Sequence, residues 1–323
     1  LKPSIRLGTK SDDYCHMNEL FGPVLSIMCA KDLENAIEIV NSTGYGLTSG
    51  IESLDEREKA IFKEKVLAGN LYLNRMTTGA IVRRQPFGGM RKSSIGSGRK
   101  AGGFNYVTQF ADITRTQTIA KDTCTNALIE HYRVNLTVDG LENILNTCEN
   151  FVYWIDKEFS QEKDYSNIRG ESNYTRYLGV KSVVLRVEPS ATIEEIICSI
   201  VAIKLVGAKL HLSIPTETTS SAIKILQENK SILLEDEELF IEDENELINA
   251  IKSHERVRFL TQEPVNEHIH KVLSSDAIYI SDEPFIGHGR LEMLHYYIEQ
   301  SISDSYHRYG NLGEHKHINK EEK

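Results

Sequence analysis

Residues 74–89 read Asn-Arg-Met-Thr-Thr-Gly-Ala-Ile-Val-Arg-Arg-Gln-Pro-Phe-Gly-Gly, a stretch that ends in two glycines. Upstream of it, short apolar runs alternate with segments whose apolar residues have helical spacing. This alternation predicts an α/β layer in which helices pack on strands. The expected strands are 23–30 (apolar enough for a buried strand), 47–51 and 69–74, and the expected helices are 32–41 and 55–67.

A second α/β pattern fills the C-terminal half and predicts a Rossmann-like parallel sheet. Strands separated by helices of about 10–15 residues imply crossovers between parallel strands. The strand expected at 182–187 is followed by Glu-Pro-Ser-Ala-Thr, with no glycine cradle for a pyrophosphate, which argues against dinucleotide binding there. The expected strands are 182–187, 209–214, 238–241, 255–260 and 277–280, and the expected helices are 193–206, 220–227, 244–252 and 291–300.

Two further segments lie between these patterns. Residues 105–119 alternate in strand fashion and are expected to form a strand that leaves the first domain. Residues 141–159 carry one apolar stripe at helical spacing, which predicts an amphipathic helix. The tail after residue 313 is polar and is expected to fray.

Composition and charge indicate a globular protein whose halves differ. The 323 residues suffice for two domains, and no run approaches the roughly 18 apolar residues that a membrane helix needs. Residues 1–115 carry a net charge of +4 and the remainder −14, which supports a domain boundary near residue 115 and argues against nucleic acid as a partner of the second half. A basic cluster has three interpretations, which are phosphate binding, solvated loop charge, or charge that faces a part of the protein outside this chain. Its members are Arg83, Arg84, Arg91, Lys92, Arg99 and Lys100.

The cysteines and histidines point to no metal centre. Five cysteines at wide, irregular spacing indicate buried or half-buried free thiols in a reducing cytoplasm. Cys15 and Cys29 do not sit in a small-residue turn that would expose a nucleophile. The histidines at 288, 295, 307, 315 and 317 lack regular spacing, so no metal ligands are predicted.

The stretch 74–89 resembles the substrate-anchor loop of the aldehyde dehydrogenases that oxidise L-glutamate γ-semialdehyde, the open form of Δ1-pyrroline-5-carboxylate. In that loop, successive backbone N–H groups hold the α-carboxylate of the substrate. The resemblance assigns this role to Gly79 and Ala80, and it assigns to Phe87 the aromatic wall beside the aliphatic part of the substrate. The alternative is an ordinary glycine-rich turn.

Residues 19–25, Glu-Leu-Phe-Gly-Pro-Val-Leu, resemble the aldehyde dehydrogenase motif that contacts the nicotinamide. There the glutamate accepts hydrogen bonds from the ribose hydroxyls, a task that suits a carboxylate. The resemblance therefore implies Glu19 and Phe21 as cofactor contacts and NAD as the cofactor.

The C-terminal half resembles the last domain of the larger proline utilization A proteins, which join a flavin proline dehydrogenase to the semialdehyde dehydrogenase. The resemblance implies a Rossmann-like domain without cofactor, whose last segment helps to cover the cavity through which the intermediate passes. The matching segments are 170–173, 176–177, 184–187, 289–294, 299–301 and 307–311. The resemblance of the first part to the aldehyde dehydrogenases identifies 105–119 as a strand lent to a neighbouring subunit.

These observations predict an α/β chain in four parts: 1–104 from an aldehyde dehydrogenase catalytic domain, 105–119 an oligomerisation strand, 120–313 a non-catalytic domain with a closing motif, and 314–323 a tail. No catalytic residue is predicted, because no nucleophilic cysteine or oxyanion asparagine is found. The chain is expected to be the C-terminal portion of a cytoplasmic, homo-oligomeric, NAD-dependent oxidoreductase of proline catabolism. It is expected to be inactive without the N-terminal remainder of the enzyme. The alternative is a non-enzymatic α/β module that binds a partner or caps an assembly.

Overall fold

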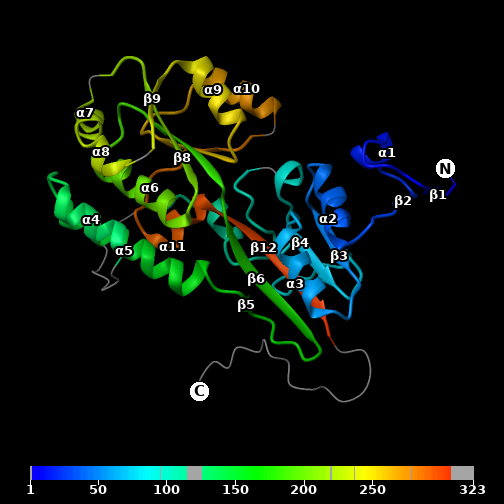
Figure 1. Cartoon of the computed structure of the whole chain (residues 1–323). Helices are drawn as coiled ribbons and strands as arrows, with labels where there is room; N and C mark the ends of the chain where they lie inside the picture. Colours follow the sequence, from blue (N-terminus) through cyan, green and yellow to red (C-terminus); the bar gives the residue numbers. More distant parts are fainter. Residues whose placement is uncertain are drawn as a thin grey trace.

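The computed structural model describes residues 2–94, 96–114, 126–218, 220–235, 237–276 and 278–306, and it places three β-sheets in them (Figure 1). One is a five-stranded parallel sheet, one a five-stranded mixed sheet, and one a two-stranded ribbon. The α/β class predicted from the sequence is confirmed. No helix in these ranges is both long enough and apolar enough to span a membrane.

The parallel sheet has the strand order β11-β10-β7-β8-β9, so the chain starts in its middle, moves to one edge and then fills the other side. This is the doubly wound order of Rossmann-type folds. The predicted parallel, Rossmann-like sheet is therefore confirmed. Its strands are β7 (Ser182–Val187), β8 (Lys209–Pro215), β9 (Leu239–Glu242), β10 (Arg256–Leu260) and β11 (Ile280–Ser281).

Helices bury both faces of the parallel sheet because its side chains alternate between them. Val183 and Leu185 of β7 join one apolar cluster, and Val184 joins the other. The first cluster draws on α4 (Ala127–Asn135), α5 (Leu141–Trp154), α6 (Ile193–Val206), α7 (Ser221–Glu228) and α8 (Lys230–Leu233), and the second on α9 (Glu244–Lys252) and α10 (Glu267–Ser275).

Helix α6 begins and ends where its sequence signals lie. Thr192 Oγ1 accepts a hydrogen bond from the Glu195 amide at 3.3 Å, and the Glu195 carboxylate accepts one from the Thr192 amide at 2.7 Å. This reciprocal capping satisfies two amide donors that the first turn of a helix leaves free. At the other end, Gly207 takes the left-handed conformation (φ 77°) that ends many helices.

The mixed sheet joins the two halves of the chain, in the order β3-β4-β12-β6-β5. The last strand, β12, runs parallel to β4 and antiparallel to β6, so Ile302 pairs with Leu71 on one side and with Tyr174 on the other. Figure 1 shows β6 and β12 as two long neighbouring strands that reach from the parallel sheet to β4. The strands are β3 (Thr48–Ile51), β4 (Asn70–Leu73), β5 (Lys163–Asp164), β6 (Glu171–Gly179) and β12 (Tyr297–Ser305).

A small apolar core lies on this shared sheet. Two helices, α2 (Leu33–Ser42) and α3 (Glu56–Lys65), contribute Ile37 and Phe62, which pack with side chains of both halves. The sheet and its core therefore cross the boundary that the charge distribution suggested near residue 115. The side chains from the strands are Leu71, Leu73, Tyr174 and Ile302.

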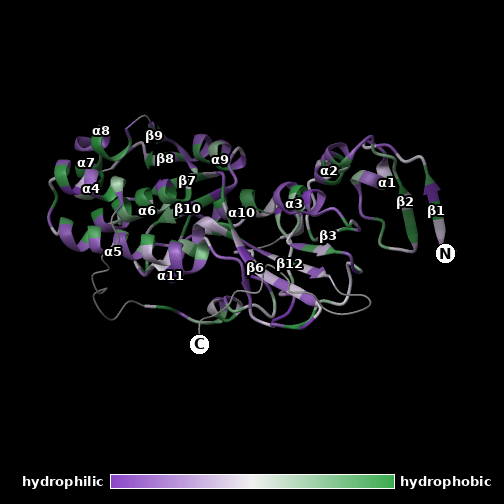
Figure 2. Ribbon diagram, turned by 60° about the horizontal axis from the view of Figure 1, so that its bottom comes forward, coloured by the Kyte–Doolittle hydropathy of each residue, from purple (hydrophilic) through white to green (hydrophobic). Residues whose placement is uncertain are grey.

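The N-terminal ribbon pairs β1 (Ser4–Leu7) with β2 (Val24–Ile27), and α1 (Tyr14–Met17) lies between them in sequence. The predicted strand is confirmed, but the expectation that it is buried is wrong for this chain. Its apolar side chains Val24, Leu25 and Ile27 are exposed, and the ribbon forms one end of the molecule (Figure 2).

The prediction of a helix at 291–300 is wrong. Residues 289–296 form two short helical turns, α11 (Gly289–Glu292) and a 3-10 helix (Met293–Tyr296), and the chain then enters β12. The reason is that 297–305 fill a central position in a sheet, where hydrogen bonds to strands on both sides outweigh the local helical spacing.

The strand expected at 105–119 is not formed in its first part. Tyr106–Phe110 make a 3-10 helix, and the Thr108 amide donates to the Asn105 carbonyl at 3.2 Å. Among the described residues no strand pairs with this segment, so its backbone groups find local partners. Residues 115–119 lie outside the described ranges.

Candidate functional site

The anchor loop, residues 74–89, leaves the carboxyl end of β4 at a turn fixed by Asn74. Asn74 has a left-handed backbone (φ 54°), and its side chain forms two hydrogen bonds of 2.9 Å with the backbone of Ser53. A left-handed asparagine is tolerated where its amide can bond to nearby backbone groups. The loop is therefore held at its start by the segment that follows β3.

The tip of the anchor loop presents backbone amides to solvent. Thr78, Gly79 and Ala80 are exposed, and Gly79 has φ 78°, a conformation that favours glycine. In the described ranges, the N–H groups of these three residues donate to no protein acceptor. Successive free amides at a bend of this kind can bind an anion such as a carboxylate.

A compact turn follows the tip. The amides of Arg84 and Gln85 donate to the Ile81 carbonyl at 3.1 and 2.8 Å, and the Ile81 amide donates to Gln85 Oε1 at 3.1 Å. Both backbone groups of Ile81 are therefore fixed by residues three or four positions later. Because Ile81 directly follows Ala80, this turn sets where the exposed tip ends.

Phe87 is placed at the base of the loop by a backbone bridge to Ala101, with two hydrogen bonds of 2.9 Å. Its ring remains partly exposed, on the same loop as Gly79 and Ala80. The structure thus brings the three expected substrate-binding residues onto one loop, with an aromatic side chain at its base and free amides at its tip.

Lys100 holds the glycine-rich part of the loop from inside the protein. Its ammonium donates to the Gly88 carbonyl and, at 3.2 Å, to Asn70 Oδ1 of β4. Burial lowers the pKa of Lys100 to about 7. Lys100 and Arg99 are both largely buried, so for these two members of the basic cluster the interpretation as solvated loop charge is wrong.

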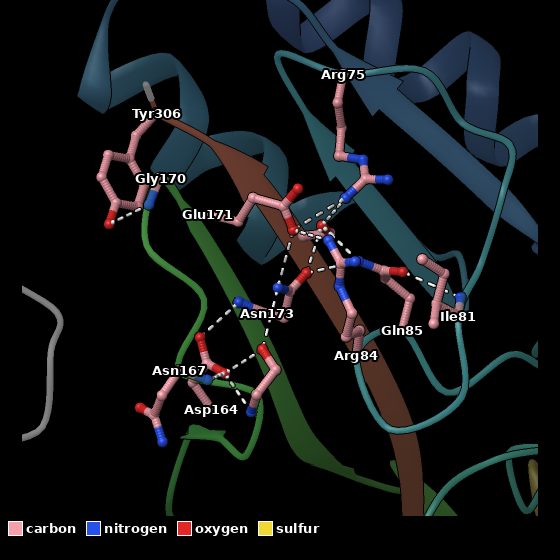
Figure 3. A network of polar contacts seen from close by, with 12 residues as sticks. Arg75, Ile81, Arg84, Gln85, Asp164, Asn167, Gly170, Glu171, Asn173 and Tyr306 are labelled. Carbon is pink, nitrogen blue, oxygen red and sulfur yellow. Dashed lines mark hydrogen bonds and ion pairs between the residues drawn. The ribbon is translucent and has the colours of Figure 1, made fainter. Parts of the chain in front are cut away.

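The C-terminal strands tether both ends of the anchor loop (Figure 3). Arg75 donates to Ser303 Oγ of β12 at 2.7 Å, and Gln85 Nε2 donates to Asn173 Oδ1 of β6 at 2.7 Å. Arg84 donates to the Glu171 carboxylate at 2.5 Å. These contacts hold the loop against strands that come from the other half of the sequence.

Glu19 and Phe21 lie apart from the anchor loop, on the exposed turn between α1 and β2. Phe21 is 99% exposed, which is unusual for an aromatic side chain. In the described ranges no hydrogen bond or ion pair joins this turn to residues 74–89. The structure therefore does not bring the two predicted groups of site residues together.

A cavity of about 710 Å³ opens at the carboxyl ends of the parallel strands, where Rossmann-type folds bind ligands. Its buried guanidinium, Arg186, is already paired with Glu188 at 2.8 Å. The cavity is lined by several carboxylates, which repel the pyrophosphate of a dinucleotide. This agrees with the missing glycine cradle. The carboxylates in its lining are Glu188, Glu242, Asp243, Glu244 and Glu263.

The first part of the chain matches one protein family. The family model described as "Aldehyde dehydrogenase family" aligns with residues 1–115, which include β1 to β4, the Glu19 turn and the anchor loop. We call residues 1–115 the aldehyde dehydrogenase segment, after the family model that they match. The proposed site residues Glu19, Phe21, Gly79, Ala80 and Phe87 all lie in this aldehyde dehydrogenase segment.

Curated proteins named 1-pyrroline-5-carboxylate dehydrogenase are similar to part of this chain. The chain is 44% identical over 109 residues to the 1-pyrroline-5-carboxylate dehydrogenase of Bacillus thuringiensis, and 40% identical over 107 residues to that of a Geobacillus strain. Each match covers 33% of this chain and 20% of the relative. The chain therefore spans about a fifth of the length of these relatives.

One solved structure resembles nearly the whole chain. Proline utilization A (PutA) from Corynebacterium freiburgense matches 94% of it at 34% identity, with a TM-score of 0.72. The match covers 27% of the PutA chain. The likeness extends past the aldehyde dehydrogenase segment, so the second half also has the fold found in that protein.

Residues that the sequence-based reasoning missed tie the aldehyde dehydrogenase segment to the second half. Gln85, Asn173 and Ser303 are almost fully buried, and no role was predicted for any of them. Gln85 and Asn173 stand in the quoted segments 74–89 and 170–173, but the sequence contains no signal that pairs them.

The described cysteines do not form a reactive site. Cys148 and Cys198 are buried with their sulfur atoms 3.9 Å apart, and burial raises the pKa of the Cys198 thiol. Cys15 is half-buried and Cys29 is exposed, so the expectation of burial is wrong for Cys29. Cys124 and the segment 307–311 lie outside the described ranges. Within those ranges no three His, Cys, Asp or Glu residues are grouped as metal ligands.

Proposed function

We propose that this chain is the C-terminal portion of an NAD-dependent L-glutamate γ-semialdehyde dehydrogenase of the proline utilization A type. The observation that carries the proposal is the anchor loop, with free amides at Thr78, Gly79 and Ala80 and an aromatic wall at Phe87. The names of the curated relatives and the likeness to PutA over 94% of the chain support it.

The anchor loop is proposed to bind the α-carboxylate of the semialdehyde. Amide donors aimed at an anion form charge-assisted hydrogen bonds, which are roughly twice as strong as those between neutral groups. Gly79 has no side chain that would block the approach, and Ala80 adds only a methyl group. With its carboxylate at the tip, the substrate can lay its aliphatic part against Phe87 and direct its aldehyde away from the loop.

Glu19 and Phe21 are proposed to contact the nicotinamide ribose and ring of NAD. Both lie on one exposed turn, and in the described ranges the Glu19 carboxylate is engaged by no other side chain. A carboxylate can accept hydrogen bonds from both ribose hydroxyls, and an exposed phenyl ring can pack beside an aromatic ring. Bound NAD would supply the hydride acceptor, and these residues would only orient it.

The nucleophile and the remaining cofactor contacts are proposed to come from a further part of the enzyme. The exposed apolar ribbon β1–β2 supports this, because such a surface is normally covered. Its exposed side chains are Ile5, Leu7, Val24, Leu25 and Ile27. The isolated chain is accordingly proposed to be inactive.

The domain bounds, the oligomeric state and the location of the complete enzyme are also proposed. Residues 1–104 are assigned to the catalytic domain, 105–119 to oligomer contacts, and 120–313 to a non-catalytic domain whose acidic cavity suits no dinucleotide. The complete enzyme is proposed to be a cytoplasmic homo-oligomer.

The experiment compares two glycine substitutions in the complete dehydrogenase. Gly79 and Gly140 both have a left-handed backbone, and neither has an atom within 4 Å of an added Cβ. Replacing either by valine therefore adds similar strain, roughly 1–2 kcal/mol. Gly79→Val is expected to raise KM for Δ1-pyrroline-5-carboxylate about tenfold or more in an NADH assay, whereas Gly140→Val leaves it unchanged.

Equal effects of the two substitutions would contradict the anchor role. If the wild-type protein formed no NADH from Δ1-pyrroline-5-carboxylate, the dehydrogenase proposal would fail. The non-enzymatic module would then be the better explanation of the fold.

A further inference from the structure

We propose that Gln85 and Asn173 are positioning residues through which the C-terminal half sets the shape of the anchor loop and hence the selectivity for an aldehyde that bears a carboxylate. The inference rests on the proposed function of the loop. It assigns to strands β6 and β12 a role in substrate recognition, although none of their side chains belongs to the proposed substrate site.

A series of hydrogen bonds runs from the Ile81 amide through Gln85 and Asn173 to Glu171, and we call this series the tether. The groups at its two ends fix the direction of every hydrogen bond in it. The Ile81 amide can only donate, so Gln85 must present Oε1 to it and direct Nε2 toward Asn173. Asn173 then accepts at Oδ1 and directs Nδ2 toward the Glu171 carboxylate at 3.2 Å, which can only accept. A backbone amide of the loop and a carboxylate of β6 therefore impose one orientation on both amide side chains.

Burial makes this chain of hydrogen bonds rigid. Gln85 is 1% exposed and Asn173 2%, so water cannot replace a lost partner. Ser303 completes the junction: it donates to Asn173 Oδ1 at 2.7 Å and receives a hydrogen bond from Arg75 at 2.7 Å. Both ends of the loop thus meet at one buried point between β6 and β12.

The tether acts on the tip through a short path. Gln85 fixes the amide of Ile81, and Ile81 follows Ala80 directly. The exposed residues from Met76 to Ala80 span the gap between Arg75 and Ile81, so their reach is set by the two tethered ends. Loss of the Gln85–Asn173 bond leaves Arg84 bound to Glu171 but loosens the hold on Ile81. The amides of Thr78 to Ala80 can then leave the arrangement that fits a carboxylate.

The control is a buried glutamine on the same sheet that does not touch the loop. Gln300 of β12 is fully buried, donates to the Ala68 carbonyl at 2.8 Å and accepts from Arg176 at 2.7 Å. Gln300→Leu removes two side-chain hydrogen bonds, against three for Gln85→Leu and four for Asn173→Leu, without loosening the anchor loop. A loss of thermal stability is expected for all three variants, and it should be smallest for Gln300→Leu.

The test measures kcat/KM of the complete dehydrogenase for two aldehydes, L-glutamate γ-semialdehyde and propionaldehyde, which lacks a carboxylate. Gln85→Leu and Asn173→Leu are expected to raise KM for the semialdehyde about tenfold or more. Their kcat, their KM for NAD and their activity on propionaldehyde should change less than threefold. Gln300→Leu should leave the ratio of the two kcat/KM values unchanged.

The outcomes separate this inference from the proposed function. A parallel fall for both aldehydes in the Gln85 and Asn173 variants would show a merely structural role and overturn the inference. Unchanged kinetics would overturn it as well. If the wild-type enzyme showed no preference for the semialdehyde, the anchor-loop proposal itself would fail, and this inference with it.

Discussion

Arg258 and Glu292 form an ion pair inside the C-terminal half: Arg258 Nη2 lies 3.3 Å from Glu292 Oε1, and neither side chain is exposed. Arg258 also donates to the Glu283 carbonyl at 2.6 Å, and the second oxygen of Glu292 accepts from the Ile286 amide at 3.0 Å. The pair therefore fastens β10 to the segment that leads into β12. The path of the last strand depends on a charge pair in the interior.

Removal of one partner should be strongly destabilising. Glu292→Leu leaves the Arg258 charge buried without a carboxylate, which typically costs about 3–5 kcal/mol in the free energy of unfolding. The double variant Arg258→Met/Glu292→Leu buries no unpaired charge and should regain most of that loss. Urea denaturation measures both values, and a single variant as stable as the wild type would refute the role given to the pair.

Lys100 should make stability depend on pH. Burial lowers its pKa to about 7, whereas an unfolded lysine keeps its proton to about pH 10.4. Between these values the unfolded chain binds more protons, so the free energy of unfolding should rise with pH by up to roughly 1.4 kcal/mol per unit. Lys100→Met should lack this contribution. The difference between the two proteins is measured by denaturation from pH 7 to pH 8.5, and a constant difference would contradict the prediction.

The capping box of α6 offers a smaller, local test. Thr192→Ala removes the side-chain acceptor for the Glu195 amide and should cost about 1 kcal/mol. Ser220 precedes α7 but its side chain makes no capping hydrogen bond, so Ser220→Ala should change stability by less than roughly 0.5 kcal/mol. Thermal denaturation of the two variants gives the comparison.

The core of the parallel sheet should be sensitive to lost volume. Leu212 of β8 is fully buried, and Leu212→Ala is expected to cost about 2–5 kcal/mol because a cavity remains. Leu54 is 97% exposed, and Leu54→Ala should stay within roughly 0.5 kcal/mol of the wild type. A large effect at Leu54 would mean that a partner or another segment covers it.

Local signals in the sequence predicted most elements of the C-terminal half. The bounds of β7, α6 and α9 agree with the expected ranges because apolar spacing, the Thr192 cap and Gly207 act over a few residues. The prediction failed at β12, where apolar residues also fit a helical period. Strand β6 was not predicted, because its polar residues are buried only through pairing with β5 and β12.

The candidate site, too, could be predicted from the sequence only in part. Gly79, Ala80 and Phe87 were predicted from one continuous stretch, and the structure places them on one loop. Gln85 and Asn173 could not be paired from the sequence, since their contact depends on β6 lying beside β12. A short continuous stretch of sequence can specify a loop, but it does not specify which distant strand will contact that loop.

The sequence by itself determined the α/β class and the positions of the main helices and strands. It could do so because hydrophobic period, capping residues and glycine conformations operate between near neighbours. The tertiary structure alone decided that the last strand enters the sheet of the first half and that buried amides from both halves meet behind the loop. Such pairings join residues far apart in the chain, and they are selected by the burial and hydrogen bonding of the whole sheet.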